Sequence, residues 1–176
     1  MTTPLVGFGN YSCVDAAYVE AMMRAALAEA EAAGEAGEYP IGAVVALEGE
    51  VLSRGRSRQR ELRSQLAHAE LEALQLGGDL LWERHDDAVL FTTVEPCPLC
   101  LGAAVMADVP HIVFAHPDPA VQSAQIVEGI PYVAAHIETY RGGVLRDESR
   151  ALFERYEPRM LDWLDDRVVR HRQTPD

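Results

Sequence analysis

Hydrophobic residues along the chain alternate between helical and extended spacing. Apolar side chains recur at helical intervals over residues 15–33 and predict a helix that ends at Gly34. Two short apolar runs, 41–47 and 51–52, lie on either side of Gly49, and this arrangement predicts a β-hairpin. The beginning of the chain is therefore expected to pack one long helix against the first two strands of a sheet.

The remaining pattern alternates helices with strands and weakens beyond residue 117. The expected elements are a loop over 54–63, a helix over 68–76, a strand over 88–94, a helix over 99–107, a strand over 111–115, a strand end at 144–145, and helices over 147–156 and 161–170. This order predicts an α/β fold with a mixed sheet and helices on both faces. We expect one domain over 1–176, with its core at about 15–118 and a helical region at 119–176.

Composition narrows the function classes. The formal net charge is −13, and all 15 basic residues are arginine, so a general nucleic-acid-binding role is disfavoured. Three cysteines do not form a disulfide framework in a chain of 176 residues. The sequence has neither a signal peptide nor an apolar run of about 18 residues, the length that crosses a bilayer. These features predict a reduced, cytoplasmic protein without membrane contact.

Cys97 and Cys100 form a Cys-x-x-Cys pair at the start of a predicted helix. Residues three apart share a helix face, so both sulfurs can reach one ion. The helix N-terminus also lowers the pKa of thiols and favours the thiolates that zinc requires. A thioredoxin-like redox pair has the same spacing, so this motif alone leaves two interpretations.

His68 and Glu70 favour the metal interpretation. Residues two apart in a helix point about 200° away from each other, so both can face one site only beyond the start of the helix. His68 lies near the start of a predicted helix that Gly77 closes. Two helix starts would then supply one imidazole and two thiolates and leave a fourth position for water, which is the catalytic arrangement of zinc. Glu70 is expected to act as a base.

This constellation predicts hydrolytic deamination. Zinc lowers the pKa of bound water and supplies hydroxide near neutral pH. Glu70 would take up the water proton, pass it to a ring nitrogen and help to protonate the departing ammonia. The expected target is the amino-substituted, amidine-like carbon of a heterocycle, which becomes an oxo group.

The words His68-Ala69-Glu70 and Pro96-Cys97-Pro98-Leu99-Cys100 match the H-x-E and P-C-x-x-C signature of zinc base deaminases. With the segments 39–45, 93–97 and 112–114, they make the chain resemble the cytidine and deoxycytidylate deaminase superfamily. Within it, the tRNA adenosine deaminase and guanine deaminase branch is most similar. The resemblance implies a three-layer α/β/α fold with a five-stranded mixed sheet, one Zn²⁺ per chain, and a homodimer or larger oligomer.

One departure from the tRNA-editing relatives concerns the substrate. Ser57 stands where the resemblance places a nucleoside-binding Asn, and Arg56 replaces an aromatic residue. A hydroxyl lacks the paired donor and acceptor of an amide. We therefore expect a small free ring as the substrate and regard tRNA as the weaker alternative.

Six residues are candidates for contact with the substrate. They are Ser57, Ala69, Glu95, Pro96, His116 and Asp118. Glu95 would contact amino or ring N–H groups, although it could equally cap a turn, while His116 and Asp118 would gate the pocket. The arginines of 54–63 would hold a phosphate or, alternatively, form a solvated edge balanced by acidic residues.

The sequence is therefore compatible with three functions. The first is a deaminase of a free nucleobase, nucleoside or related ring. The second is a tRNA adenosine deaminase that makes inosine. The third is a non-catalytic zinc domain that serves as a partner subunit, which the presence of Glu70 disfavours.

Overall fold

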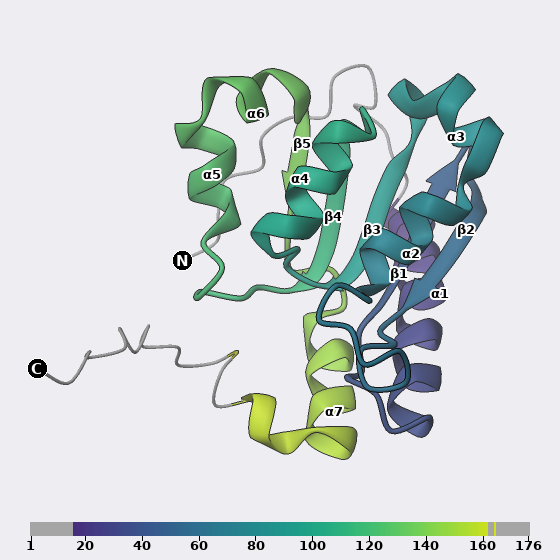
Figure 1. Ribbon diagram of the computed structural model, residues 1–176, viewed down its shortest axis with the longest axis vertical. Helices are drawn as coiled ribbons and strands as arrows, with labels where there is room; N and C mark the ends of the chain where they lie inside the picture. The colour runs from purple at the N-terminus through teal and green to yellow at the C-terminus, as the bar shows by residue number, and fades with distance from the viewer. Residues whose placement is uncertain (1–15, 162–163, 165–176) are drawn as a thin grey trace, which may run out of the picture.

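A computed structural model describes residues 16–161 and residue 164 of the chain. Its centre is a five-stranded sheet with the order β2-β1-β3-β4-β5 (Figure 1). The strands are β1 (Gly42–Leu47), β2 (Glu50–Arg56), β3 (Val89–Val94), β4 (His111–His116) and β5 (Thr139–Arg141). β1 pairs antiparallel with β2 and β3, whereas β3, β4 and β5 are parallel. The predicted mixed sheet of five strands is confirmed.

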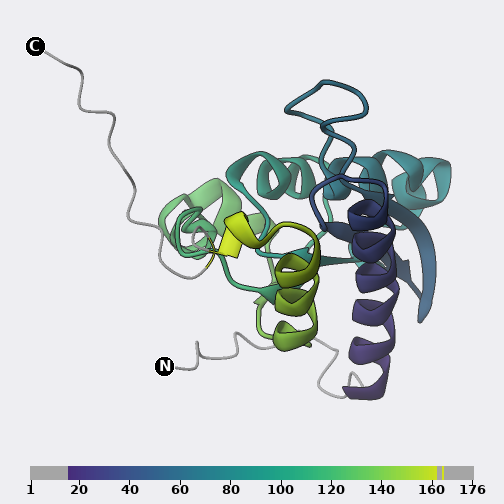
Figure 2. The same cartoon turned by 90° about the horizontal axis from the view of Figure 1, so that it is seen from below.

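Helices cover both faces of this sheet, so the predicted three-layer architecture is also confirmed (Figure 2). One layer contains α1 (Ala16–Glu35) and α7 (Arg146–Tyr156). The other contains α2 (Ala69–Leu76), α3 (Gly78–Arg84), α4 (Pro98–Met106), α5 (Ser123–Gly129) and α6 (Pro131–His136). Short 3₁₀ turns, η1 (His85–Asp87) and η2 (Pro158–Met160), follow α3 and α7.

Strand burial explains why the central strands contain continuous apolar runs. Every residue of β1 and β4 is buried, because helices cover both sides of these strands. β2 lies at the sheet edge and is partly exposed. The core is divided by the sheet into a cluster under α2 and α4, which includes Leu90 and Leu101, and a cluster under α1, which includes Met23 and Phe91.

Two glycines let helices approach the hairpin closely. A Cβ on Gly42 would collide with the backbone of α1 at Ala26 and Ala30. A Cβ on Gly55 would collide with the backbone of α2 at Ala69 and Ala73. Gly55 therefore fixes how close the start of α2 lies to the sheet, and this position matters because Ala69 stands between two candidate site residues.

Several local predictions need correction. The segment 54–63 was expected to be a loop, but β2 continues to Arg56 because residues 54–56 pair with β1. No strand ends at 144–145; the last strand among the described residues is β5, at 139–141, within the region expected to be helical. The pattern also missed α3, α5 and α6. The predicted helix over 161–170 lies mostly outside the described residues.

Within the part of the chain that the structure covers, no helix has both the length and the hydropathy needed to cross a bilayer.

Candidate metal centre and active site

Two helix starts meet beyond the end of β3. His68 is the N-cap of α2, and Cys97 is the N-cap of α4, with Pro98 at the first helical position. Cys100 lies one turn into α4 and is fully buried. The helices that cover one face of the sheet begin at the edge where the carboxyl ends of β3 and β4 lie. This arrangement follows from the order of the elements in the sequence.

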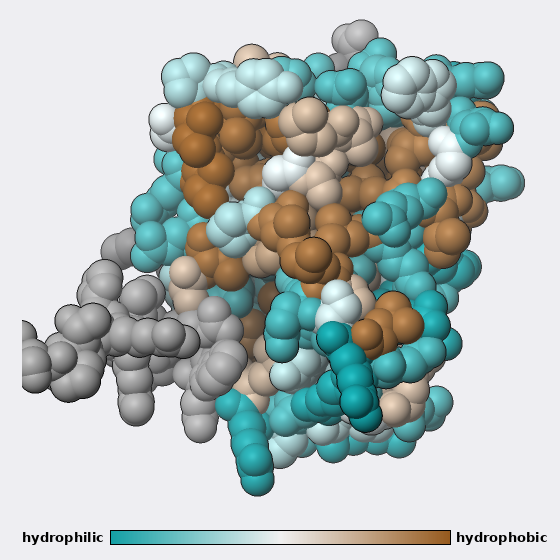
Figure 3. All heavy atoms as spheres, in the orientation of Figure 1, coloured by the Kyte–Doolittle hydropathy of each residue, from teal (hydrophilic) through white to brown (hydrophobic). Residues whose placement is uncertain are grey.

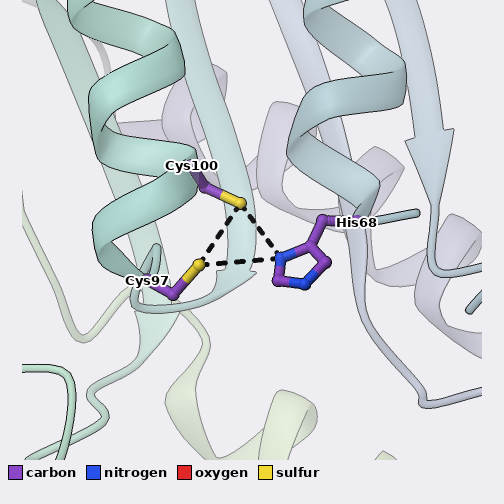
Figure 4. Close-up of side chains that lie close together, drawn as sticks. All are labelled: His68, Cys97 and Cys100. Carbon is purple, nitrogen blue, oxygen red and sulfur yellow. Dashed lines mark hydrogen bonds between the residues drawn. The ribbon is translucent and has the colours of Figure 1, made fainter. Parts of the chain in front are cut away.

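The three predicted ligands come together (Figure 4). Their ligand atoms all lie within 4.8 Å of one another. His68 Nδ1 is 3.2 Å from Cys100 Sγ and 3.6 Å from Cys97 Sγ, and the two sulfurs are 3.6 Å apart. The side chains converge on one point from two different helices.

These separations fit a tetrahedral zinc ion. Bond lengths of about 2.3 Å to sulfur and about 2.0 Å to nitrogen place tetrahedral ligand atoms about 3.5 to 3.8 Å apart. The three observed distances fall at or slightly below that range. Among the described residues this is the group of His, Cys, Asp and Glu side chains that can hold a metal ion, and one imidazole with two thiols is a donor set that zinc favours.

The electrostatics of the thiols point to the same cation. Hydrogen bonding to Cys100 and His68 lowers the pKa of the Cys97 thiol to about 4. Its interaction with Cys97, together with burial, raises the pKa of the Cys100 thiol. One thiolate thus opposes formation of the second at this short distance. A divalent cation between the sulfurs would stabilise both thiolates.

Glu70 lies beside the cluster without belonging to it. Its side chain is 4 % exposed, and its Oε2 is 3.3 Å from Cys100 Sγ. Thr92 on β3 donates a hydrogen bond of 3.1 Å to its Oε1. Burial raises the pKa of this carboxyl group. A buried carboxyl group with a raised pKa, contacted by Thr92 at one oxygen and by Cys100 Sγ at the other, is suited to accept and release protons.

A cavity of about 530 Å³ opens onto His68, Glu70 and Cys97. Four of the six predicted substrate contacts line it, namely Ser57, Ala69, Glu95 and Asp118. The loop that follows β2 contributes further polar walls. This size is typical of sites for small molecules.

Pro96 and His116 are not among the described lining residues of this cavity. The carbonyl of Pro96 accepts a 2.7 Å hydrogen bond from the Ser123 hydroxyl. His116 is buried at the end of β4, with Nδ1 2.8 Å from the Pro117 carbonyl. Pro96 lies between the lining residues Glu95 and Cys97, and the His116 carbonyl accepts the backbone N–H of Glu95 at 2.7 Å. Contact of either residue with a substrate stays a prediction.

Glu95 holds the loop after β4 and also lines the cavity. One carboxylate oxygen accepts the backbone N–H of Asp118 at 3.0 Å, and the other accepts the Tyr140 hydroxyl at 3.1 Å. Burial raises the pKa of its carboxyl group. The side chain therefore orders the loop after β4 while it also faces the cavity.

Most of the other residues that line the cavity were not predicted from the sequence. Further lining residues are Tyr39, Ile41, Gln59, Arg60, Gln65, Val94, Val121, Glu157, Arg159, Met160 and Leu164. The last four belong to the segment after α7, which the fold brings across the cavity. No motif marks these positions, because their role depends on long-range packing.

The arginine-rich segment is largely neutralised by carboxylates. Arg54 pairs with Glu29, and Arg58 pairs with Glu61 and Glu72. Arg60 pairs with Glu157. This favours the balanced edge over the phosphate-binding surface among the two interpretations of the segment.

Comparison with known proteins places the chain in a family. Residues 17–116 match the cytidine and deoxycytidylate deaminase zinc-binding region. A tRNA-specific adenosine deaminase from Agrobacterium fabrum is 34% identical over 144 residues, which is 80% of this chain and 95% of that protein. The chloroplastic tRNA(adenine(34)) deaminase of Arabidopsis thaliana is 41% identical over 56% of this chain, which covers only 8% of that longer protein.

A solved guanine deaminase from Nitrosomonas europaea superposes with a TM-score of 0.63 at 29% identity, over 78% of this chain and 83% of that one. Together with the cluster of His68, Cys97 and Cys100, these matches confirm the predicted zinc cofactor and the predicted deaminase class. The chain belongs to the cytidine and deoxycytidylate deaminase family.

Proposed function

We propose that this chain deaminates a small free heterocycle, a nucleobase, a nucleoside or a related aminated ring, with Glu70 as its catalytic residue. The observation that carries the proposal is that Glu70, His68 and Cys97 share one cavity of small-molecule size. The reaction exchanges a ring amino group and water for a ring oxo group and ammonia.

The residues divide the chemistry between them. A zinc ion bound by His68, Cys97 and Cys100 would act as a Lewis acid that makes water acidic near neutral pH. Glu70 accepts the proton of the attacking water on the carboxylate oxygen that Thr92 leaves free, and passes it to a ring nitrogen. The same carboxyl group then takes up the second proton of the attacking water and delivers it to the leaving amino group, so that the two water protons end on the ring nitrogen and in ammonia.

Charge supports a free ring over a polynucleotide. Among the described residues that line the cavity, four are carboxylates (Glu70, Glu95, Asp118 and Glu157) and two are arginines (Arg60 and Arg159). A nucleotide within an RNA strand would bring phosphates on both sides to a cavity whose described lining holds more carboxylates than arginines. Arg60 is already engaged by Glu157.

A second candidate, tRNA adenosine deamination, is favoured by the likeness to the Agrobacterium fabrum enzyme over nearly its whole length. The third, a non-catalytic zinc subunit, has no comparable observation in its favour, since Glu70 is present and faces the cavity.

A substrate panel separates these functions. Zinc-loaded wild-type protein is assayed for ammonia release from guanine, adenine, cytosine, aminotriazines and the corresponding nucleosides, and for inosine in an anticodon stem-loop RNA. We expect at least one free ring to be turned over with kcat/KM of about 10⁴ M⁻¹ s⁻¹ or more. Inosine in the RNA with no ammonia from free rings would establish the second function instead. Stoichiometric zinc without either product would establish the third.

Within the cavity we assign ring contacts to Ser57, Ala69, Glu95 and Asp118. The Ser57 hydroxyl can donate or accept one hydrogen bond, and the carboxylates can accept ring N–H groups. Pro96 and His116 are not among the described lining residues. They would therefore affect the substrate only indirectly, by positioning neighbouring residues that line the cavity.

We also propose a homodimer that forms on the face of α2, α3, α4 and α6. Large apolar side chains are exposed there: Leu76, Leu80, Trp82, Leu99, Met106, Ile130 and Tyr132. Figure 3 shows apolar surface gathered over α4, α5 and α6. Light scattering should give twice the 19.3 kDa chain mass, and Met106→Glu should shift it toward one chain. A wild-type monomer would contradict the dimer.

The cellular location of the chain is inferred from the thiol chemistry of the metal site. Cys97 and Cys100 must stay reduced to bind zinc, and we therefore propose a cytoplasmic location. Export of the chain to an oxidising compartment, tested by fractionation of cells, would contradict it.

A further inference from the structure

Arg60 contacts three separate segments at the rim of the cavity. Its Nη2 donates a hydrogen bond to the Glu157 carboxylate, and its Nη1 donates one to the Gly37 carbonyl. Its guanidinium group also lies 4.4 Å from the centroid of the Tyr39 ring. Arg60, Tyr39 and Glu157 all line the cavity. A single side chain thus joins the loop after β2, the connection between α1 and β1, and the segment after α7.

The backbone from which Arg60 projects is held by a buried carboxylate. Glu38 is 4 % exposed, and its two oxygens accept the backbone N–H groups of Arg60 at 2.9 Å and Glu61 at 2.6 Å. An isolated surface ion pair gains little, because two long side chains must be ordered to form it. Here the backbone, the Gly37 carbonyl and the Tyr39 ring already order Arg60, so less conformational entropy is lost when it binds Glu157.

On the other side of the ion pair, Glu157 begins the segment that covers the cavity. Met160 and Leu164 from this segment line the cavity and pack with Val94 and Phe153. Phe153 is fully buried, and Leu164 is 2 % exposed. We call the described residues 157–161 and 164 the roof segment. Met160 and Leu164 face the cavity, while Arg60 holds Glu157, the first residue of the segment.

We propose that Arg60 is a positioning residue for substrate binding: by holding Glu157, it keeps Met160 and Leu164 in contact with the ring in the cavity. This inference rests on the proposed function, which names a flat heterocycle as the substrate. Apolar contacts with a ring face are equally strong in the ground state and in the transition state, so their loss changes KM more than kcat. Glu70 and the metal ligands lie on α2 and α4, apart from the roof segment.

The test uses the full-length zinc-loaded chain with Arg60→Glu and with the reversed pair Arg60→Glu/Glu157→Arg. For whichever free ring the wild type deaminates, Arg60→Glu should raise KM about tenfold and leave kcat within about twofold. The reversed pair should bring KM back to within about threefold of wild type, because the attraction across the rim is restored.

Arg155→Glu is the matched control. Arg155 also makes an ion pair, at 3.1 Å to Glu31, and lies 4.9 Å from the centroid of the Tyr156 ring. It is absent from the described lining of the cavity. Its charge reversal should leave KM unchanged, so a general effect of charge or stability is separated from loss of the roof contact.

Hydrogen–deuterium exchange of residues 157–161 gives a readout that does not depend on turnover. Exchange should be faster in Arg60→Glu and should return to the wild-type rate in the reversed pair. Unchanged KM and unchanged exchange in Arg60→Glu, or failure of the reversed pair to restore either, would overturn the proposal. If the wild type releases no ammonia from any free ring, the proposed function fails, and exchange still decides the role of Arg60.

Discussion

Replacing Glu70 with glutamine will reduce kcat by about 10²- to 10⁴-fold, the contribution typical of a general acid–base group, while zinc stays bound. Glutamine has nearly the same shape and can still accept the hydrogen bond from Thr92, but it cannot take up the water proton. The metal ligands remain intact because Glu70 is not one of them. Ammonia release and zinc content, measured on the same sample, check both halves of the prediction.

Glu72→Gln is the matched control for this variant. Glu72 lies two residues further along α2 and accepts hydrogen bonds from the Arg56 backbone and the Arg58 side chain, away from the cavity. Its kcat should stay within about twofold of wild type, as expected for a surface substitution without contact to the reacting atoms. A Glu70→Gln protein with wild-type turnover would remove Glu70 from the mechanism.

Replacing Cys100 with serine will weaken zinc binding by about 100-fold or more and remove activity with it, because loss of a metal ligand costs more than loss of its outer partners. A serine hydroxyl does not ionise near neutral pH and is a poor zinc ligand. Cys100 is also fully buried at the start of α4, so we expect the apparent Tm to fall as bound metal is lost. Elemental analysis and thermal unfolding, each with and without added zinc, measure the two effects.

Cys13→Ser makes the same chemical change outside the metal motif, and it should keep one zinc per chain. Retention of stoichiometric zinc and of the wild-type Tm by Cys100→Ser would show that Cys100 is not a ligand.

The metal centre could be predicted from the sequence because its geometry is local. Cys97 and Cys100 lie on one helical turn, and His68 and Glu70 can face a common site only from a helix start, which the structure confirms for α2. The hairpin and the buried strands were predicted from equally local features, namely short apolar runs and the glycine between two of them. Local spacing does not show that the two helix starts lie side by side. That pairing was predicted from the H-x-E and P-C-x-x-C signature of zinc base deaminases.

The features that could not be predicted depend on contacts between residues far apart in the chain. β5 is three residues long and only Thr139 in it is buried, so its pattern gives no strand signal without β4 as its partner. Arg60 and Glu157 are 97 positions apart in the chain. The sequence left both interpretations of the arginine-rich segment open because the carboxylates that neutralise it, such as Glu29 and Glu157, are brought to it only by folding.

Anomalous diffraction from crystals of the wild-type chain, recorded on both sides of the zinc absorption edge, tests the central claim most directly. We predict a single strong peak within about 2.0 Å of His68 Nδ1 and about 2.3 Å of both Cys97 Sγ and Cys100 Sγ, with Glu70 outside bonding distance. A peak bonded to other residues, or a disulfide between Cys97 and Cys100 with no peak beside it, would contradict the account.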